Sequence, residues 1–430
     1  MLNRYFKLTE NGTDVRTELV AGLTTFLTMA YIIFVNPTIL GDAGMPRDAV
    51  FVATCLAAAL GSLIMGLYAN YPIGMAPGMG LNAYFAYAVV LGMGMPWQSA
   101  LGAVFLSGCM FLLVSVLGLR AMIVEGIPPA LRSAITVGIG LFLALIALKN
   151  AGIVKAHPIT MVTAGDLHQP AALMAIVGFL LTIALDRLKV GGAILIGIAV
   201  VTLLSILFGG NQVRHLVSLP PSLAPTFLQL DIGGALSSGF LNVVLVFFLV
   251  ELFDATGTLM GVASRAGLLV KGKMVRLNKA LLADSGAIIA GAALGTSSTT
   301  AYIESAAGVQ AGGRTGLTAI VVALLFLACL FFAPLAAVVP PYATAPALLY
   351  VACLMLRDLS QIDWEETTES VPAAITVLVI PFTYSIAEGI GFGFIAYALL
   401  KLLTGQARKV APVVWVIAAA FLFKFMYVGA

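Results

Sequence analysis

Glu304 is a carboxylate in a polar, glycine-containing stretch of an otherwise apolar chain. It lies nine residues after Gly295, within residues 294–308, where Gly, Ser and Thr interrupt the apolar pattern. An ionisable side chain inside a membrane span costs at least about 2.5 kcal/mol on insertion scales, so it is kept mainly where it has a task. Irregular backbone at that depth is tolerated only where it lines protein or a water-filled cavity. We therefore expect the chemistry of this chain at Glu304 and around it.

A second acidic cluster lies in the apolar run 248–261. Glu251 and Asp254 are three residues apart, so they share one face of a helix. Neither Glu251 nor Glu304 has a basic residue within its own span, which leaves proton uptake and release as a role open to both. Asp254 is equally well explained as a structural residue that bonds groups of a neighbouring span.

The composition is that of an all-α polytopic membrane protein. Hydrophobic residues make up 61% of the 430 residues and charged residues 10%, and the mean hydropathy is +1.07. Apolar runs such as 22–40, 131–148 and 319–339 can cross about 30 Å of hydrocarbon at about 1.5 Å per residue. No run of the sequence alternates polar and apolar residues for long, which argues against strands. The four cysteines stand singly in apolar runs, so we expect no metal site.

The basic residues test the number of membrane crossings, which is about fourteen when the shorter runs broken by Gly or Pro are counted. With a cytoplasmic N-terminus, all but five of the 22 Lys and Arg residues fall on the cytoplasmic side. Arg47, Lys149, Lys155 and Arg214 fall outside, and Lys424 lies in a final apolar segment. This asymmetry is the one that the positive-inside rule predicts. Whether the final segment crosses the membrane or lies against it is left open.

Two broken apolar segments occupy matching places in the two halves of the chain. Residues 71–85 follow two full spans in the first half, and residues 295–308 follow two in the second. Seven spans per half is an odd number, so the second half must be inverted relative to the first, as in many secondary transporters. Half-helices that begin near Gly80 and near Thr299 would aim their partly positive N-termini at one central point. Residues 297–300 are suited to capping the second of them.

Nucleotide hydrolysis finds no support in the sequence. Residues 267–274 match GxxxxGK, but the Ser or Thr that binds magnesium is missing and the stretch lies in a basic loop. His157, His168 and His215 map to outer loops, which leaves carboxylates as the proton carriers. We therefore expect no cofactor, with energy supplied by a proton gradient or by the gradient of the solute.

Glu388 is interpreted as bracing a helix end.

Five stretches resemble the AzgA-type purine permeases of the nucleobase-ascorbate transporter superfamily: residues 22–37, 78–85, 251–257, 296–317 and 381–389. The resemblance covers nearly the whole chain. It implies fourteen spans in two inverted repeats, residues 1–225 and 226–405, followed by an apolar segment, 406–430, with segments 3 and 10 as the broken half-helices. It also implies a core domain, about 17–120 and 236–340, that holds the substrate. A gate domain, about 130–210 and 342–405, would pack beside it and allow a homodimer.

The resemblance also assigns the site. The implied substrate contacts are Gly80, Asn82, Glu251, Thr300, Tyr302 and Glu304, with Tyr31 or Phe34 stacking on the base. Asn82 offers both a donor and an acceptor. Proton coupling falls to Glu251, Asp254 or Glu304, and the sequence does not decide among them. Many relatives that accept hypoxanthine and guanine carry Asp where this chain has Glu251, so the acid is kept here with one more methylene.

The acid at position 251 favours 6-oxopurines. Hypoxanthine and guanine present N1–H, from which an ionised carboxylate accepts a charge-assisted hydrogen bond, whereas adenine presents a lone pair there. The resemblance therefore implies proton symport of hypoxanthine and guanine across an inner membrane, with adenine as the alternative, and neither enzymatic activity nor a nucleic-acid partner. A sulfate-type anion transporter fits less well because three acids repel an anion. An intramembrane enzyme lacks the HExxH, GxGD and Asp-rich motifs.

Overall fold

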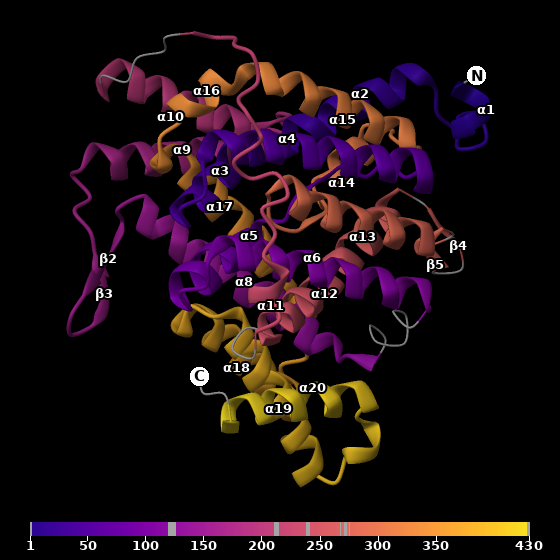
Figure 1. Cartoon of the computed structure of the whole chain (residues 1–430), viewed down its shortest axis with the longest axis vertical. Helices are drawn as coiled ribbons and strands as arrows, with labels where there is room; N and C mark the ends of the chain where they lie inside the picture. The colour runs from indigo at the N-terminus through magenta and orange to yellow at the C-terminus, as the bar shows by residue number, and fades with distance from the viewer. Residues whose placement is uncertain are drawn as a thin grey trace.

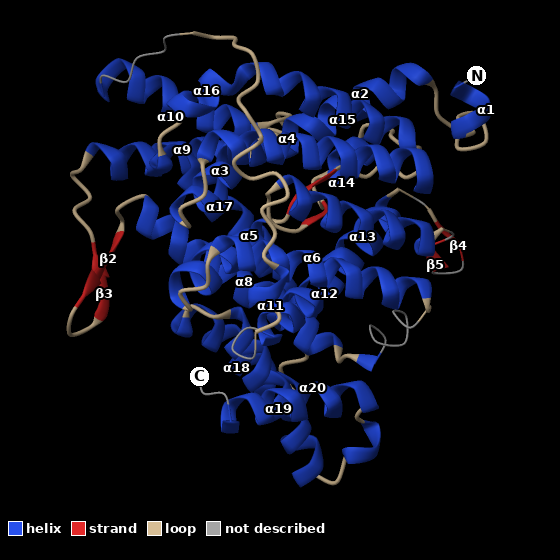
Figure 2. Cartoon of the chain, viewed as in Figure 1, coloured by secondary structure: helices blue, strands red, loops and turns tan. Residues whose placement is uncertain are grey.

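The computed structural model describes residues 2–118, 126–209, 215–237, 241–266, 268–270, 273–274 and 276–427. Arg120, Arg214 and Lys271, which entered the charge count, lie outside the described residues. Figure 2 shows a body made almost entirely of helices. In Figure 1 the N-terminus and the β4–β5 hairpin lie at one end of the long helices, and the β2–β3 hairpin lies at the other.

The elements carry the labels of Figure 1 where it shows them. The first half contains α1 (Leu2–Phe6), α2 (Val15–Met29), α3 (Ile32–Asp42), α4 (Arg47–Ile64), η1 (Met65–Ala69), β1 (Met75–Pro77), α5 (Met79–Ala83), η2 (Tyr84–Gly92), α6 (Trp97–Val116), α8 (Pro129–Asn150), β2 (Val154–His157), β3 (Met161–Ala164), α9 (Pro170–Arg187) and α10 (Ala193–Gly209). The second half contains α11 (Ile232–Ala235), α12 (Leu241–Arg265), β4 (Leu269–Val270), β5 (Lys273–Met274), α13 (Leu277–Leu294), β6 (Thr299–Ala301), α14 (Ser305–Gln310), α15 (Gly316–Cys329), η3 (Leu330–Phe332), α16 (Ala333–Val338), α17 (Pro341–Met355), η4 (Leu356–Gln361), α18 (Thr367–Thr383), α19 (Ile386–Leu403), η5 (Ala407–Lys409) and α20 (Pro412–Tyr427).

The described helices confirm a multi-pass membrane protein. Ten helical runs within the described residues are long and apolar enough to cross a bilayer. Shorter apolar helices accompany them at Met79–Gly92, Ala193–Phe208, Thr367–Thr383 and Pro412–Met426. The sequence did not foresee strands, yet three antiparallel pairs form among the described residues: β1 with β6, β2 with β3 and β4 with β5. Each strand has two to four residues, too short to leave an alternating pattern.

The helices pack in two groups. One group is built from α2, α3, α4, α6, α12, α13 and α15, and the other from α8, α9, α10, α17, α18 and α19. The groups touch where α5 meets α8, where α3 meets α17, where α2 meets α10 and where α12 meets α19. The two broken segments belong to the first group, and α5 carries the first of them to the boundary.

The start of α15 is held by a carboxylate from α2. Glu18 is fully buried and accepts hydrogen bonds from the backbone N–H groups of Arg314 (2.9 Å), Thr315 (3.2 Å) and Thr318 (3.1 Å). The Thr318 hydroxyl donates a fourth at 2.5 Å. A helix N-terminus has unpaired N–H groups and a partial positive charge. A carboxylate placed there accepts hydrogen bonds from those N–H groups and compensates the charge.

Asp231 has the matching position at the start of α6. The Ser99 hydroxyl donates to it at 2.6 Å and the Gly234 N–H at 2.9 Å, and these bonds hold the pKa of Asp231 below its usual range. The Asp231 N–H in turn donates to the Gln98 carbonyl at 3.1 Å. Glu18 of the first half thus binds the start of α15 in the second half, and Asp231 of the second half binds the start of α6 in the first.

The C-terminal apolar segment forms α20, which runs antiparallel along α19. Val413 lies against Gly126, just before α8, whereas Phe421 and Phe425 lie against Gly391 near the start of α19. Lys424 forms a buried ion pair with Glu388. The helix rises by roughly 16 Å between Val413 and Lys424 at about 1.5 Å per residue. The segment therefore packs along the length of α19, and Glu388 anchors it.

Glu18→Ala should lower the apparent melting temperature of the detergent-solubilised protein. The change removes four hydrogen bonds to a buried carboxylate and leaves the first turn of α15 unpaired, a loss of about 3 kcal/mol or more. The measurement is the fraction of monodisperse protein after heating, read by size exclusion. Glu10→Ala is the control, because Glu10 pairs only with Lys7 at the surface, and it should not change the melting temperature. Equal melting of the two variants would show that Glu18 does not anchor α15.

Candidate functional site

The two broken segments meet in a short pair of strands. β1 and β6 are antiparallel, with Met75 opposite Ala301 and Pro77 opposite Thr299. Two backbone bonds extend the pair: the Gly78 N–H donates to the Ser298 carbonyl at 2.8 Å, and the Tyr302 N–H donates to the Gly74 carbonyl at 3.0 Å. Figure 2 shows this pair as the red arrows in the middle of the helical body. Residues more than 200 positions apart are thereby fixed against each other.

Each strand is braced by the helix that precedes it. Ser62 of α4 accepts from the Met75 N–H at 2.9 Å and donates to the Met75 carbonyl at 3.3 Å. Asp284 of α13 accepts from the Ala301 N–H and from the Thr300 hydroxyl, each at 3.2 Å. Met75 and Ala301 lie opposite each other in the strand pair. Ser62 and Asp284 therefore brace the pair at the same rung, one for each strand.

The helix that follows β6 begins later than the sequence predicted. We expected a half-helix near Thr299 capped by residues 297–300, but Thr299 and Thr300 lie in β6, and α14 begins at Ser305 with Glu304 in the N-cap position. The β-branched threonines favour the extended backbone that pairs with β1. The first segment agrees with the expectation, since α5 begins at Met79.

Glu304 is held by an aromatic residue from the first span. Tyr31, at the break between α2 and α3, donates its hydroxyl to Glu304 Oε1 at 2.6 Å. Thr28, one turn earlier, approaches the Glu304 carbonyl at 3.4 Å. Tyr31 is thus engaged with the acid, and Phe34 lies one turn further on, half-buried against the main core.

Tyr302 and Asn82 converge on the same carbonyl. The Tyr302 hydroxyl donates to the Pro77 carbonyl at 2.6 Å, and the Asn82 side-chain amide approaches it at 3.5 Å. Asn82 is fully buried, and its Oδ1 has no hydrogen-bond partner among the described residues. A buried polar atom without a partner costs free energy, so this acceptor is suited to a ligand.

Glu251 is the most enclosed of the acids chosen from the sequence. It is fully buried on α12, where the Ser107 hydroxyl of α6 donates to its Oε1 at 3.0 Å. No hydrogen bond of normal geometry reaches its Oε2 from the described residues, although the Ser298 hydroxyl also interacts with this carboxylate. Because α12 packs against α5, this second acceptor lies on the helix next to the one that carries Asn82.

Asp254 lies one turn beyond Glu251 on α12 and is exposed. It interacts electrostatically with Asp284 and Glu304. Glu251 interacts in the same way with Asp284 and Asp254. The structure therefore gathers the three predicted acids and adds a fourth.

Sequence reasoning missed Asp284. It is fully buried in α13 and holds the strand that leads to Glu304. The signal was present, because Asp284 is an ionisable residue within an apolar span, the same rule that selected Glu251 and Glu304. The remaining predicted residues, Gly80 and Thr300, lie at the start of α5 and within β6.

Gly80 lies at a close contact between the two helix groups. A Cβ atom on Gly80 would stand 2.6 Å from Cγ2 of Ile139 in α8. Real Cβ contacts are not this short, so only glycine lets α5 lie this close to α8. The broken segment is therefore packed directly against the second group of helices.

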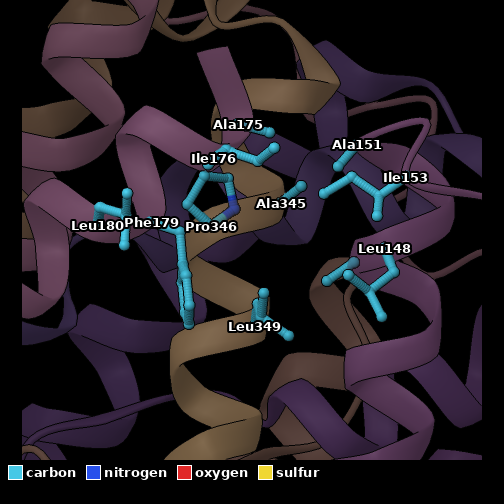
Figure 3. Close-up of a pocket in the computed structure, with 11 residues that line it drawn as sticks. Leu148, Ala151, Ile153, Ala175, Ile176, Phe179, Leu180, Ala345, Pro346 and Leu349 are labelled. Atoms are coloured by element: carbon cyan, nitrogen blue, oxygen red, sulfur yellow. The ribbon is translucent and has the colours of Figure 1, made fainter. Parts of the chain in front are cut away.

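Figure 3 shows a cavity elsewhere in the molecule, between α8, α9 and α17. It has a volume of about 70 Å³ and is lined by apolar side chains, among them Leu148, Phe179, Pro346 and Leu349. A purine presents hydrogen-bonding groups around its edge, and this lining offers no side chain to meet them. The acids and Asn82 therefore make the better candidate site.

Comparison with known proteins places this geometry in a family. The model of a permease family matches residues 16–392. The chain belongs to that permease family. It is 49% identical to the adenine permease AdeP of Escherichia coli strain K12, covering 100% of this chain and 97% of that protein. It is 45% identical to the guanine/hypoxanthine permease PbuO of Bacillus subtilis strain 168, covering 97% and 99%. The resemblance to purine permeases is thus confirmed.

The fold also matches a solved structure. The transmembrane domain of the cyanobacterial bicarbonate transporter BicA superposes with a TM-score of 0.62 over 95% of this chain and 96% of that domain. The two sequences are only 17% identical. The likeness therefore establishes the fold of the permease and carries no information on its substrate.

Gly80→Ala should destabilise the permease by about 1–3 kcal/mol, because the new methyl group overlaps Ile139. The measurement is the apparent melting temperature in detergent. Ile139→Ala, which removes the clashing side chain, should restore part of the loss in the double variant, a coupling that contacting residues show. Gly286→Ala in α13 is the matched control, since no atom lies within 4 Å of its added Cβ. Additive effects of the two changes would contradict the close contact between α5 and α8.

Proposed function

We propose that this permease imports purine nucleobases by proton symport, with hypoxanthine and guanine as its preferred substrates. The observation that carries the proposal is the pair of buried acceptors, Glu251 Oε2 and Asn82 Oδ1, that no hydrogen bond of normal geometry reaches from the described residues. Both flank the strand pair at which the two broken segments meet. A planar base with N–H groups on its edge would satisfy them.

The pattern of acceptors supports the 6-oxopurines. An ionised Glu251 accepts from N1–H of hypoxanthine, and from the additional amino group of guanine, in charge-assisted bonds. Asn82 Oδ1 can accept an imidazole-ring N–H, while its amide donates to a ring nitrogen or an oxygen. A site built for one pattern rejects the other by orders of magnitude, because its buried polar groups would go unpaired.

Adenine is the second candidate, and one observation favours it: the identity to the adenine permease AdeP, 49%, is higher than that to the guanine/hypoxanthine permease PbuO, 45%. The difference is too small to rank the substrates. Adenine presents a lone pair at N1, so it would need a protonated Glu251 as the donor. The two candidates therefore differ in the charge of one carboxylate while the base is bound.

The fourteen-span architecture in two inverted repeats, 1–225 and 226–405, is also proposed. Ten described runs are long enough to span, and three shorter apolar helices together with the β6–α14 segment would bring the count to fourteen. The antiparallel β1–β6 register supports the inversion, as do the paired braces Ser62 and Asp284. The acids Glu18 and Asp231 at equivalent helix starts support it further.

The two packing groups support a core domain, about 17–120 and 236–340, and a gate domain, about 130–210 and 342–405. All four acids belong to the first group, and α5 faces the second across Gly80. We propose that the core moves against the gate, which exposes the site to either side in turn. An inner-membrane location with a cytoplasmic N-terminus and a homodimer through the gate complete the proposal.

The accessible side of the site supports an inward-open arrangement. Asp254 and Gly257 on α12 are exposed, and Ile303 is 41% exposed, toward the end of α12 that leads to β4. Toward the opposite end of the broken segment, Tyr84 and Phe85 are fully buried. Water can therefore approach the acids from the side of the N-terminus. An anion substrate fits this site poorly, because the carboxylates would repel it.

Radiolabelled hypoxanthine should accumulate in purine-transport-deficient cells that express the permease, more at low external pH than at high. Unlabelled guanine should compete, and adenine should not. Glu251→Gln should weaken apparent affinity for hypoxanthine about tenfold, since a charge-assisted hydrogen bond is worth about 1.5 kcal/mol or more. Glu365→Gln, in an exposed loop, is the control. Competition by adenine would show that the preferred substrates are not limited to hypoxanthine and guanine. The absence of uptake for every base would refute the proposed function.

Proton coupling should depend on the carboxylates. Proton flux and uptake measured together in proteoliposomes should separate in at least one of Glu251→Gln, Asp254→Asn, Glu304→Gln and Asp284→Asn, because the neutral side chain cannot release a proton. Such a variant would still exchange labelled for unlabelled base without moving protons. Unaltered coupling in all four variants would rule out the carboxylate mechanism, whereas loss of exchange in all of them would assign the acids to binding alone.

A further inference from the structure

The β2–β3 hairpin stands apart from the helical body. It connects the end of α8 to the start of α9, both of which are long enough to cross a bilayer. In Figure 1 it lies at the end of the molecule opposite the N-terminus and runs across the direction of α4 and α13. A ribbon in this position, tied to two membrane spans, lies at the level of a membrane surface and roughly parallel to it.

The register of the hairpin gives it one apolar and one polar face. Opposed residues of an antiparallel pair share a face, and successive residues alternate. Val154 opposes Ala164 and Ala156 opposes Val162, so these four residues form the first face. On the second face, Lys155 opposes Thr163 and His157 opposes Met161. Met161 is the only apolar residue on that second face.

The described residues leave most of the apolar face uncovered, although Val154 is half-buried. Val162 is 51% exposed, Ala156 and Ala164 are also exposed, and Ile159 at the tip is 86% exposed. The tip is nevertheless ordered, because His157 Nδ1 accepts from the Thr160 N–H at 3.2 Å. A ribbon that leaves most of an apolar face open is expected to have a partner.

We propose that the β2–β3 hairpin lies in the interface of the outer leaflet, with its apolar face and Ile159 toward the acyl chains and its polar face toward water. The occupant of the apolar face is thus a phospholipid surface. An amphipathic element binds such a surface through buried apolar area and through attraction of cations to phosphate groups.

The charges of the hairpin fit this partner. Lys155 stands on the polar face, and Lys149, also exposed, ends α8 just before the ribbon. Both side chains can extend along the interface to the phosphate groups of the lipid, because long basic side chains keep their charged ends in the polar layer. Anchored in this way, the hairpin would hold the outer end of α8 and α9 fixed in the membrane while α5 moves past α8. The proposal does not depend on which base is carried.

The test places a fluorophore on either face of the full-length protein in nanodiscs that hold a single copy. Cys55→Ala, Cys109→Ala, Cys329→Ala and Cys353→Ala remove the native thiols, and Ala156→Cys or Thr163→Cys adds one on a neighbouring rung. Each variant is labelled with an environment-sensitive dye and exposed to nitroxide-labelled phospholipid or to aqueous iodide. The label at 156 should emit at shorter wavelength and be quenched several-fold more by the lipid nitroxide. The label at 163 should be quenched more by iodide.

Equal quenching of both labels by iodide would overturn the proposal. Protection of the 156 label only in discs that hold two copies would also overturn it, in favour of contact between two chains. If the cysteine-free parent aggregates, Val162→Trp and Thr163→Trp in the native chain report the same difference through quenching by brominated phospholipid. Uptake of labelled base should match that of the parent in every variant, since the hairpin touches none of the site residues.

Discussion

The pairing of β1 with β6 is the interaction on which the rest of the site depends. Backbone N–H and C=O groups inside a bilayer must find partners within the protein. The two broken segments, 71–85 and 295–308, pair with each other through β1 and β6, and each supplies backbone partners that the other lacks. The breaks are therefore stable only together, and this requirement places Asn82 and Glu304 on either side of one crossing. Ser62 and Asp284 then fix the crossing to the helices behind it.

Some buried acids have their carboxylate oxygens paired within the protein, and others have an oxygen that can still accept a hydrogen bond. Glu18 uses both oxygens on the first turn of α15, and Glu388 is neutralised by Lys424, so both hold structure. Glu251 has a hydroxyl on one oxygen and no hydrogen bond of normal geometry from the described residues on the other. A buried charge left in this condition is costly unless a proton or a ligand completes it. The distinction between the structural and the functional acids therefore lies in their partners and could not be read from residue type.

This distinction explains how far the sequence could go. Glu251 and Glu304 were predicted as site residues because an acid in an apolar run is a strong local signal, and in the structure both interact electrostatically with Asp254. The bond between Tyr31 and Glu304 joins residues 273 positions apart, and no local pattern encodes it. Asp284 carries the same local signal and was overlooked, whereas its bonds to Thr300 and Ala301 in β6 are tertiary contacts that no local pattern encodes. The start of α14 was misplaced because strand pairing with β1, a tertiary contact, overrode the capping residues before it.

The position of Gly80 connects the strand crossing to transport. The α5 helix starts at the crossing and begins its first turn against Ile139, so the segment that offers Asn82 to a ligand is also the one in contact with the second group of helices. If the groups slide past each other, the contact at Gly80 must break and the site must travel with the first group. A base bound between Asn82 and Glu251 would add contacts within that group alone. The contacts of the base would then stay unchanged while the first group moves against the second. A carrier needs this if the bound base is to be carried from one side to the other.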